Sequence, residues 1–259
     1  MRLSLSGEIE RCAALCDAAD ALLNLFFPQS CLACGDALAR QRDRGVCGAC
    51  WKRIAGLALS PPWCPSCGVP MAARGDASHL CSRCIVEPPE FAAARSFGVY
   101  TAELRSAIHA LKFDGRRDLG EPLGRLLASA CRESWSAGDL DCIVPVPLHV
   151  RRRRERGFNQ AAVLARVLSR ELSVACREEV LGRSRATPPQ VGMDEQQRAH
   201  NVRNAFTVPA GAELRGMRIL LVDDVYTTGA TAASASRALR AAGALRVSVL
   251  TLARAVEDY

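Results

Sequence analysis

Short apolar runs alternate with amphipathic segments through the second half of the chain. Three runs are almost continuously apolar, which is typical of buried parallel strands: Asp141–Val146, Arg218–Val222 and Arg246–Ala253. Between them, apolar residues recur at helical spacing, as do Leu104, Ile108 and Leu111 on one predicted face. The predicted helices are Ala102–Phe113, Leu119–Cys131, Gln160–Leu172 and Ala232–Ala242.

Alternating strands and helices predict an α/β fold with a mainly parallel sheet and helices on both of its faces. Ligands of such sheets bind at the carboxyl ends of the strands. The residues that follow Val146 and Val222 are therefore expected to face one crevice.

The first residues show a different pattern. Ile9 to Phe27 favour an amphipathic helix that docks on the protein, with a membrane-surface role as the alternative. The apolar stretch Ala21–Phe27 is too short to span a bilayer, and early acidic residues argue against a signal peptide. We therefore expect no stable membrane insertion and a cytoplasmic location.

Eight of the 13 cysteines form four Cys-x-x-Cys pairs between this helix and Pro88-Pro89. Pairs at this spacing chelate zinc, and two successive pairs complete a tetrahedron. We expect two structural zinc sites, one on Cys31, Cys34, Cys47 and Cys50 and one on Cys64, Cys67, Cys81 and Cys84. Disulfides and a redox function are the alternatives.

Three parts follow from these patterns. Residues 1–27 form the N-terminal helix, residues 28–88 a small cysteine-rich double zinc ribbon, and residues 89–259 the α/β domain. The length of 259 residues is sufficient for one sizeable domain and a smaller one.

The strand Arg218–Val222 leads into the chemically richest segment. Asp223 and Asp224 come first, and paired carboxylates accept hydrogen bonds from vicinal hydroxyls such as those of a ribose. The turn Thr227, Thr228, Gly229, Ala230 and Thr231 then enters a helix N-terminus, which suits a phosphate. A plain strand–loop–helix connection is the alternative, whereas a Walker A loop is excluded because the turn lacks Gly-Lys-Ser/Thr.

A basic run follows the strand that ends at Val146 and reaches Gln160. Guanidinium groups suit the oxygens of a pyrophosphate, and Arg156-Gly157 is the preferred candidate. A solvated basic loop or a nucleic-acid contact surface remains an alternative. The net charge of +7 agrees with acidic partners, although the strong bias toward arginine also fits genome composition.

The polar segment Arg183–Phe206 lies between core strands and has little apolar periodicity. A long polar loop at such a position is often a lid. Gln190 and Arg198 are the candidates for lid contacts, and a local docking surface is the alternative.

The loop Asp223–Thr231 resembles the 5-phosphoribosyl 1-pyrophosphate (PRPP) loop of type I phosphoribosyltransferases. Together with the cysteine pairs, Leu111–Gly115, Val144–Pro147, Arg156–Gln160 and Arg198–Val202, it is similar to the ComF/GntX family of double-zinc-ribbon, phosphoribosyltransferase-like proteins. The resemblance implies PRPP binding with Mg²⁺ and a role linked to competence and DNA uptake.

The resemblance also implies site roles. Asp223 and Asp224 would hold the ribose, and the turn from Thr227 to Thr231 the 5-phosphate. Arg156 and Arg198 would stabilise the departing pyrophosphate, and Lys112 would be a further phosphate contact. Phosphoribosyl transfer to an unidentified acceptor is the leading hypothesis. A non-catalytic PRPP-sensing adaptor that binds single-stranded DNA or a helicase-like partner is the alternative, and the oligomeric state stays open.

Overall fold

The computed structural model describes residues 29–38, 45–71, 79–185, 197, 201–202 and 204–255. The chain divides into two compact units, Met1–Gly56 and Leu57–Tyr259. The predicted N-terminal helix lies outside the described residues, as do Gln190 and Arg198.

The first unit is built around its cysteines. Its helix α2 (Gly48–Ala55) begins at Cys47, whose sulfur accepts a hydrogen bond from the Cys50 backbone N–H. Cys50 and Ile54 are fully buried on one side of this short helix. Among residues 29–38 and 45–56, the part of this unit that the structure describes, so small a core is consistent with folding that depends on a metal.

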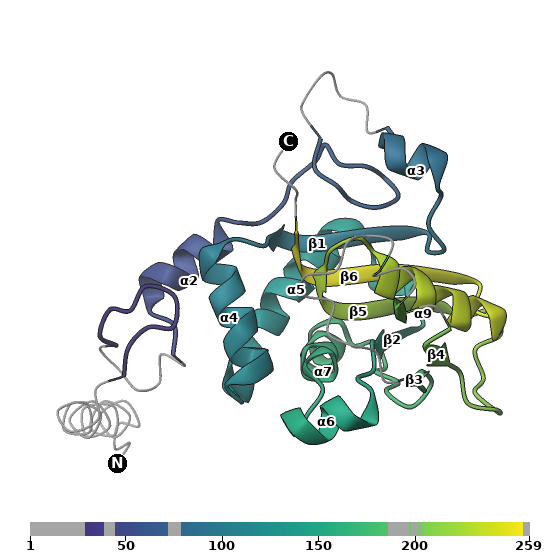
Figure 1. Cartoon of the computed structure of the whole chain (residues 1–259). Helices are drawn as coiled ribbons and strands as arrows, with labels where there is room; N and C mark the ends of the chain where they lie inside the picture. The colour runs from purple at the N-terminus through teal and green to yellow at the C-terminus, as the bar shows by residue number, and fades with distance from the viewer. Residues whose placement is uncertain are drawn as a thin grey trace, which may run out of the picture. The chain divides into compact units, whose positions relative to one another are not determined.

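The second unit contains a four-stranded parallel sheet, as the sequence predicts. Its order is β1 (Ala93–Val99), β6 (Arg246–Arg254), β5 (Arg218–Tyr226) and β2 (Cys142–Pro145), and Figure 1 shows the strands in this order. A separate antiparallel pair joins β3 (Gly182–Arg183) to β4 (Phe206–Thr207). The central strands β5 and β6 are the longest and carry mostly buried residues.

The helices of this unit whose bounds the structure describes are α3 (Ser82–Val86), α4 (Ala102–Phe113), η2 (Arg117–Leu119), α5 (Gly120–Ser134), η3 (Ala137–Asp139), α6 (Val150–Arg156), α7 (Gln160–Leu172) and α9 (Ala230–Ala241). One face of the sheet packs against α9, where Ile219 and Leu221 join Ala235 and Leu239 in one core cluster. The other face packs against α5 and α7. Alternate residues of each strand thus enter two cores.

Helices α5 and α7 approach each other closely because α5 presents two glycines to two valines. A Cβ on Gly120 would lie 2.3 Å from Val163 Cγ1, and a Cβ on Gly124 would lie 2.5 Å from Val167 Cβ. Only the missing side chains allow this distance between the helices.

Gly124→Ala is therefore expected to lower the free energy of unfolding by about 1–3 kcal/mol, because the added methyl group overpacks the contact with Val167. Denaturant unfolding measures this change. Gly138→Ala is the matched control, since nothing lies within 4 Å of a Cβ there. Equal stability of the two variants would contradict the close approach of these helices.

The predicted elements match the structure to different degrees. The bounds of α4 and α7 agree with the prediction, and β5 continues beyond the predicted Val222 to Tyr226, so both aspartates lie on the strand. Strand β1 was not predicted. The arginine-rich run, for which no helix was predicted, forms the helix α6. Its C-cap is Gly157, whose φ of 78° permits the sharp exit.

The second cysteine cluster belongs to the same compact unit as the sheet. The Ala94 N–H donates to the Ser66 carbonyl at 2.7 Å, which adds the cysteine-rich turn to the edge of β1. The boundary between the two compact units, at Gly56/Leu57, therefore falls inside the cysteine-rich segment. The sequence instead predicts one cysteine-rich part, residues 28–88, followed by the α/β domain. Among the described residues, no helix combines the length and apolar character needed to cross a bilayer.

Candidate functional site

The two cysteine clusters repeat the same local structure. In each, a glycine with positive φ closes the first turn, Gly35 at 80° and Gly68 at 74°. The first cysteine of each cluster also accepts the backbone N–H of the third, from Cys47 to Cys31 and from Cys81 to Cys64. Gly48, directly after Cys47, is the first residue of α2.

The sulfur positions fit zinc. The four Sγ atoms of each cluster lie within 4.8 Å of one another, in the two groups that the spacing predicts. Sulfur–sulfur distances of 3.7 Å (Cys31–Cys50), 3.8 Å (Cys34–Cys47) and 3.7 Å (Cys67–Cys81) match the ~3.8 Å of a tetrahedron with Zn–S bonds of ~2.3 Å. Four thiolates fill the zinc shell, which is characteristic of structural sites.

Metal analysis of the purified protein is expected to find two zinc ions per chain, one for each four-cysteine group. Cys84→Ser should lower the content toward one, and Cys131→Ser should not, because Cys131 is buried in the core outside both groups. Two zinc ions retained by the Cys84 variant would contradict the assignment of its ligands.

The turn after β5 forms an open helix N-terminus. Gly229 has a φ of 81° and is the N-cap of α9, so its backbone turns in a way that other residues rarely adopt. A Cβ there would lie 2.3 Å from the Tyr226 hydroxyl oxygen. Thr228 Oγ1 accepts the Ala230 N–H at 3.4 Å, and residues 227–231 are half-buried. Backbone N–H groups and threonine hydroxyls therefore lie together where a phosphate can bind.

The two aspartates have different surroundings. Asp224 is buried, and its Oδ1 lies 2.8 Å from Lys112 Nζ while its Oδ2 accepts from Gln160 Nε2 at 2.7 Å. Asp223 is half-buried, and its Oδ1 accepts the Asp224 backbone N–H at 2.9 Å. Successive residues of a strand point to opposite faces, so only Asp224 reaches toward α4 and α7.

Burial and the negative charge of Asp224 raise the pKa of Asp223 to about 7, well above that of an ordinary aspartate. A carboxyl group with such a pKa is sensitive to a ligand that donates hydrogen bonds or brings positive charge. Perturbed carboxyl groups of this kind concentrate at functional sites.

The raised pKa predicts a pH-dependent stability of the ligand-free protein. Because folded Asp223 holds its proton more tightly than the unfolded chain does, its contribution to stability is lost as pH rises through about 7. Asp223→Asn is thus expected to be more stable than the wild type by about 2–4 kcal/mol at pH 8, with the difference shrinking toward pH 5. Denaturant unfolding across this range tests it, and a pH-independent difference would contradict the shift.

Arg156 joins the same network. Its Nη1 donates to Gln160 Oε1 at 2.6 Å, and its guanidinium lies over the Phe113 ring at 4.9 Å. Partial burial lowers the pKa of Arg156, and the nearby Asp224 opposes that shift. The structure thus connects four residues from three parts of the sequence in the order Arg156, Gln160, Asp224 and Lys112.

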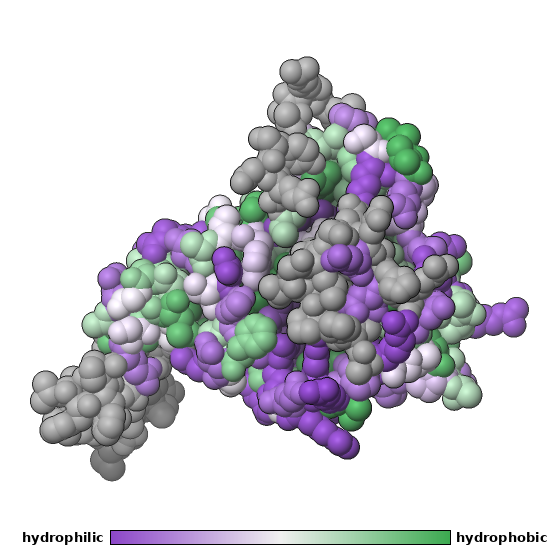
Figure 2. Space-filling view, in the orientation of Figure 1, coloured by the Kyte–Doolittle hydropathy of each residue, from purple (hydrophilic) through white to green (hydrophobic). Residues whose placement is uncertain are grey.

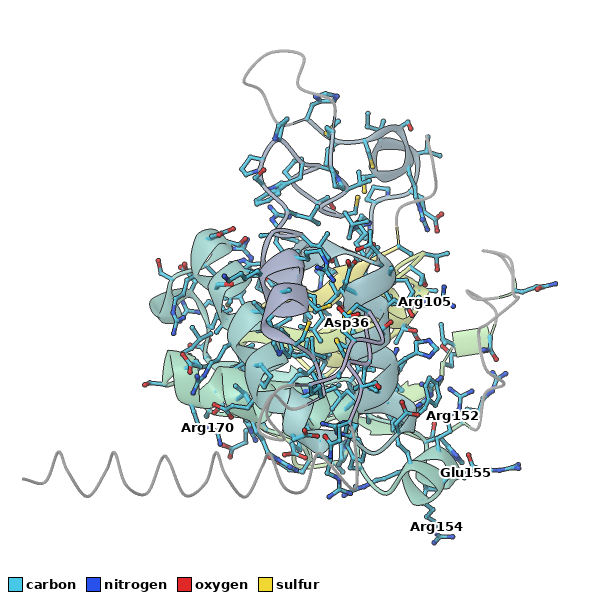
Figure 3. The ribbon with its side chains drawn as sticks, turned by 90° about the vertical axis from the view of Figure 1, so that its left-hand side faces the viewer. Asp36, Arg105, Arg152, Arg154, Glu155 and Arg170 are labelled. Carbon is cyan, nitrogen blue, oxygen red and sulfur yellow. The ribbon has the colours of Figure 1, made fainter. Side chains whose placement is uncertain are left out.

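Helix α6 presents two sides. Arg152 and Arg156 are half-buried, whereas Arg151, Arg153 and Arg154 are exposed. Figure 3 shows Arg154 projecting away from the ribbon, and Figure 2 shows a hydrophilic surface where α6 lies. Gly157 follows, and its carbonyl accepts from Arg117 Nη2 at 3.0 Å.

The two ends of the predicted lid segment lie among the described residues. Arg183 on β3 pairs with Phe206 on β4, and the Val202 carbonyl accepts from Ser234 Oγ of α9 at 2.6 Å. Both ends of the segment are thereby joined to the side of the sheet that α9 covers. The lid candidates between them, Gln190 and Arg198, stay predictions.

Sequence reasoning did not single out Gln160 and Tyr226. Gln160 is 5% exposed and bridges Arg156 to Asp224, and its place in the Arg-Gly-Phe-Asn-Gln run was the available signal. Tyr226 is buried beneath Gly229, and no sequence pattern around Tyr226 predicts that contact.

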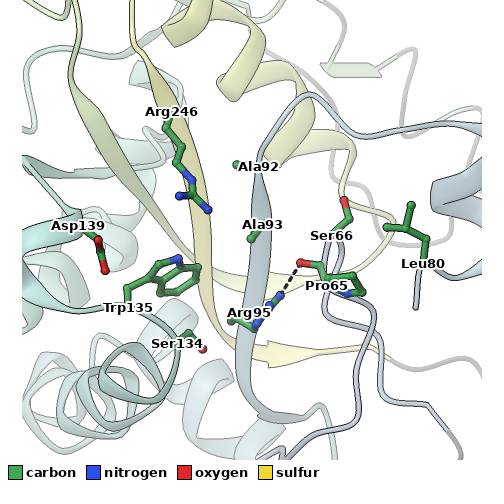
Figure 4. Close-up of a pocket in the computed structure, with 10 residues that line it drawn as sticks. All are labelled: Pro65, Ser66, Leu80, Ala92, Ala93, Arg95, Ser134, Trp135, Asp139 and Arg246. Carbon is green, nitrogen blue, oxygen red and sulfur yellow. Dashed lines mark hydrogen bonds between the residues drawn. The ribbon is translucent and has the colours of Figure 1, made fainter. Parts of the chain in front are cut away.

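A cavity of 480 Å³ lies at the opposite end of the sheet (Figure 4). Its lining includes Ala93 and Arg246, the first residues of β1 and β6, together with Arg95 and Trp135. It is at the amino ends of the strands, whereas the aspartates and the turn 227–231 lie at the carboxyl ends, where ligands of open α/β sheets collect. We therefore place the candidate site at the latter.

Comparisons with known proteins agree with this architecture. The family described as a double zinc ribbon domain matches residues 22–85, and the phosphoribosyl transferase domain family matches residues 156–259. DNA utilization protein YhgH of Salmonella typhi is 34% identical over 233 residues, covering 89% of this chain and 99% of the relative.

Competence proteins are also similar. Competence protein F of Haemophilus influenzae is 33% identical over 234 residues, covering 89% of this chain and 99% of the relative. Competence protein ComFC of Bacillus subtilis is 27% identical over 225 residues, covering 82% and 85%. The matches span both the cysteine-rich segment and the α/β domain.

Proposed function

We propose a function from the premise that this chain belongs to the ComF family of double-zinc-ribbon, phosphoribosyltransferase-domain proteins. It binds PRPP with Mg²⁺ and transfers the phosphoribosyl group to an acceptor that is not yet identified. The observation that carries the proposal is the network from Arg156 through Gln160 and Asp224 to Lys112 beside the turn 227–231. It supports one site with groups for both ends of PRPP.

The turn 227–231 would hold the 5-phosphate. Its threonine hydroxyls and the first N–H groups of α9 are donors, and the helix dipole favours negative charge there. Gly229 lets the backbone approach the ligand because it has no side chain. Binding at this remote end would orient the reacting carbon.

Asp223 and Asp224 would accept hydrogen bonds from the ribose hydroxyls. Asp224 is oriented by Lys112 and Gln160, so its carboxylate is held in place before the ligand arrives. Mg²⁺ supplies charge neutralisation on the pyrophosphate and would be coordinated largely by substrate oxygens and water. Asp223, whose pKa is raised, would become ionised as the ribose hydroxyls donate to it.

Arg156 would stabilise the negative charge that develops on the departing pyrophosphate. Its contact with Gln160 and its position over Phe113 restrict the side chain. A cation that is already held in place stabilises developing charge without the cost of reorientation. Lys112 lies on the other side of Asp224 and would add a second positive charge. Arg198, on the lid segment, is the proposed contact that completes the site on closure.

The relatives' names associate two of them with competence and one with DNA utilization, so we place this activity in DNA uptake. A second candidate is a PRPP-sensing adaptor that binds single-stranded DNA or a helicase-like partner. It is favoured by Arg151, Arg153 and Arg154 of α6, which are exposed, whereas Arg156 of the network is half-buried. Such binding would weaken steeply with salt.

A pyrophosphate-release assay with PRPP, Mg²⁺ and a panel of bases and amines separates the two. The transferase function predicts release that depends on one acceptor and is lost in Arg156→Ala. The matched control is Arg154→Ala on the exposed side of the same helix, which should retain activity. PRPP binding without turnover on any acceptor would leave the adaptor, and salt-insensitive DNA affinity would argue against the arginine contacts.

A further inference from the structure

A buried arginine connects the second cysteine cluster to the strand that carries the PRPP loop. Arg254 is the last residue of β6, is only 4% exposed, and donates from Nη2 to the carbonyl oxygen of Cys67. Cys67 is one of the four candidate zinc ligands of that cluster. A buried guanidinium lowers the stability of the fold unless nearby groups replace its lost contacts with water. The Cys67 carbonyl is one such group, so its position affects how well Arg254 is stabilised.

The other support of Arg254 is the ring of Tyr226. The guanidinium carbon lies 4.1 Å from the ring centroid, and Arg254 and Tyr226 are partners in the β5–β6 register. Phe91 packs edge-on against the same ring at 6.3 Å. Cation–π contacts away from water are stronger than exposed ones, so this pair constrains the orientation of Tyr226.

Tyr226 in turn lies against the PRPP loop. Its hydroxyl oxygen would be 2.3 Å, and its Cζ 2.7 Å, from a Cβ on Gly229. The ring therefore fills the space beneath the N-cap of α9. Displacement of the ring would remove the surface on which this turn rests.

The turn that carries Cys67 is itself fixed to the sheet. A Cβ on Gly68 would lie 2.2 Å from the Ala94 carbonyl oxygen, and Arg95 Nη1 donates to the Pro65 carbonyl at 3.1 Å. The turn is thus joined to β1 on one side and to Arg254 on the other.

We propose that Tyr226 and Arg254 are positioning residues that couple metal occupancy of the Cys64–Cys84 cluster to the PRPP loop. The coupling rests on the proposed PRPP binding and extends it. Without metal the four thiols no longer hold the turn, the Cys67 carbonyl moves away from Arg254, and Tyr226 loses its support. PRPP affinity falls, and by linkage bound PRPP raises the affinity of this cluster for zinc.

The first experiment needs no PRPP. Amide hydrogen exchange over residues 226–233 is compared between Cys81→Ser/Cys84→Ser and the equivalent pair of the first cluster, Cys47→Ser/Cys50→Ser. We expect exchange to rise about tenfold or more in the former only, since local opening follows lost support. Equal exchange in the two variants would overturn the coupling whether or not PRPP binds.

The second experiment measures zinc release to a chromophoric chelator from Cys47→Ser/Cys50→Ser, which retains only the second cluster. PRPP with Mg²⁺ should slow release about fivefold or more, because zinc leaves through local opening of the cluster and bound PRPP makes that opening rarer. The effect should vanish when Asp223→Asn/Asp224→Asn is added, which excludes direct chelation by PRPP. It should also vanish in Arg254→Gln and return in part in Arg254→Lys, which keeps a cation for the Cys67 carbonyl and the Tyr226 ring.

The outcomes separate the two proposals. If calorimetry shows that PRPP binds but release is unchanged, the coupling is wrong and the proposed function stands. If PRPP does not bind, the proposed function is wrong, and hydrogen exchange still decides whether the cluster supports the turn. If Arg254→Gln does not fold, hydrogen exchange in the two cysteine double variants, which retain Arg254, still tests the coupling.

Discussion

Changing Asp223 and Asp224 together to asparagine is expected to weaken PRPP binding by about 100-fold or more. Hydrogen bonds to charged groups contribute about 1.5–3 kcal/mol each, so two such losses correspond to at least this factor. Lys112 would also lose its ionised partner at 2.8 Å, which disturbs the network that reaches Arg156. Calorimetric titration with PRPP and Mg²⁺ measures the effect.

Asp141→Asn is the matched control for this prediction. Asp141 forms an ion pair of 2.7 Å with Arg218 at the amino end of the same strand, far along β5 from the aspartate pair. Its loss should leave PRPP affinity within about twofold of the wild type, because exposed ion pairs contribute little. Unchanged affinity in the double asparagine variant would show that these carboxylates do not contact the ligand.

Gly229→Ala is the second substitution with a large expected effect. Alanine must adopt a φ of 81°, and its Cβ must avoid the Tyr226 hydroxyl at 2.3 Å. We expect a loss of about 1–3 kcal/mol in the free energy of unfolding from strain and overpacking. We also expect PRPP affinity to fall by about tenfold or more, since the phosphate-binding N–H groups shift.

Gly211→Ala separates the effect of backbone strain from that of overpacking against Tyr226. Gly211 has a similar φ of 85°, but nothing lies within 4 Å of a Cβ there. It reports the cost of backbone strain alone and should leave PRPP affinity unchanged. If the two alanine variants lose the same stability and both bind PRPP normally, the close packing of Tyr226 beneath the loop is not important for the site.

Local sequence patterns were sufficient to predict those elements whose burial follows from their own residues. Helices α4 and α7 could be predicted to the residue because their apolar positions repeat at helical spacing and clear breaks follow them, at Asp114-Gly115 and at Ser173. The cysteine groups could be predicted from spacing alone, because the chelate geometry is local to each pair.

Strand β1 could not be found in this way. Its sequence, Ala-Ala-Arg-Ser-Phe-Gly-Val, contains an arginine and small residues, and its burial comes from β6 and from the cysteine-rich turn that hydrogen-bonds to its edge. Helix α6 was missed for the converse reason. A run of arginines shows no apolar periodicity, yet Gly157 and the His149 cap define a short helix.

The sequence singles out Lys112, Arg156 and the two aspartates as candidates, but neither Gln160 nor the network that joins these residues could be predicted. Asp224 and Gln160 are separated by 64 positions, and only the parallel order of β2 and β5 brings the start of α7 to the end of β5. The sequence also treats Asp223 and Asp224 as equivalent, whereas the pleat of the strand gives them different partners.

Calorimetric titration of the zinc-loaded protein with PRPP and Mg²⁺ tests the central claim most directly. We predict saturable binding of one PRPP per chain with a dissociation constant below about 1 mM, the upper end of ordinary substrate affinities. Binding should be lost in the Asp223→Asn/Asp224→Asn variant and retained in Asp141→Asn. No binding to the wild type at millimolar PRPP, or equal binding to all three proteins, would contradict the assignment of this site.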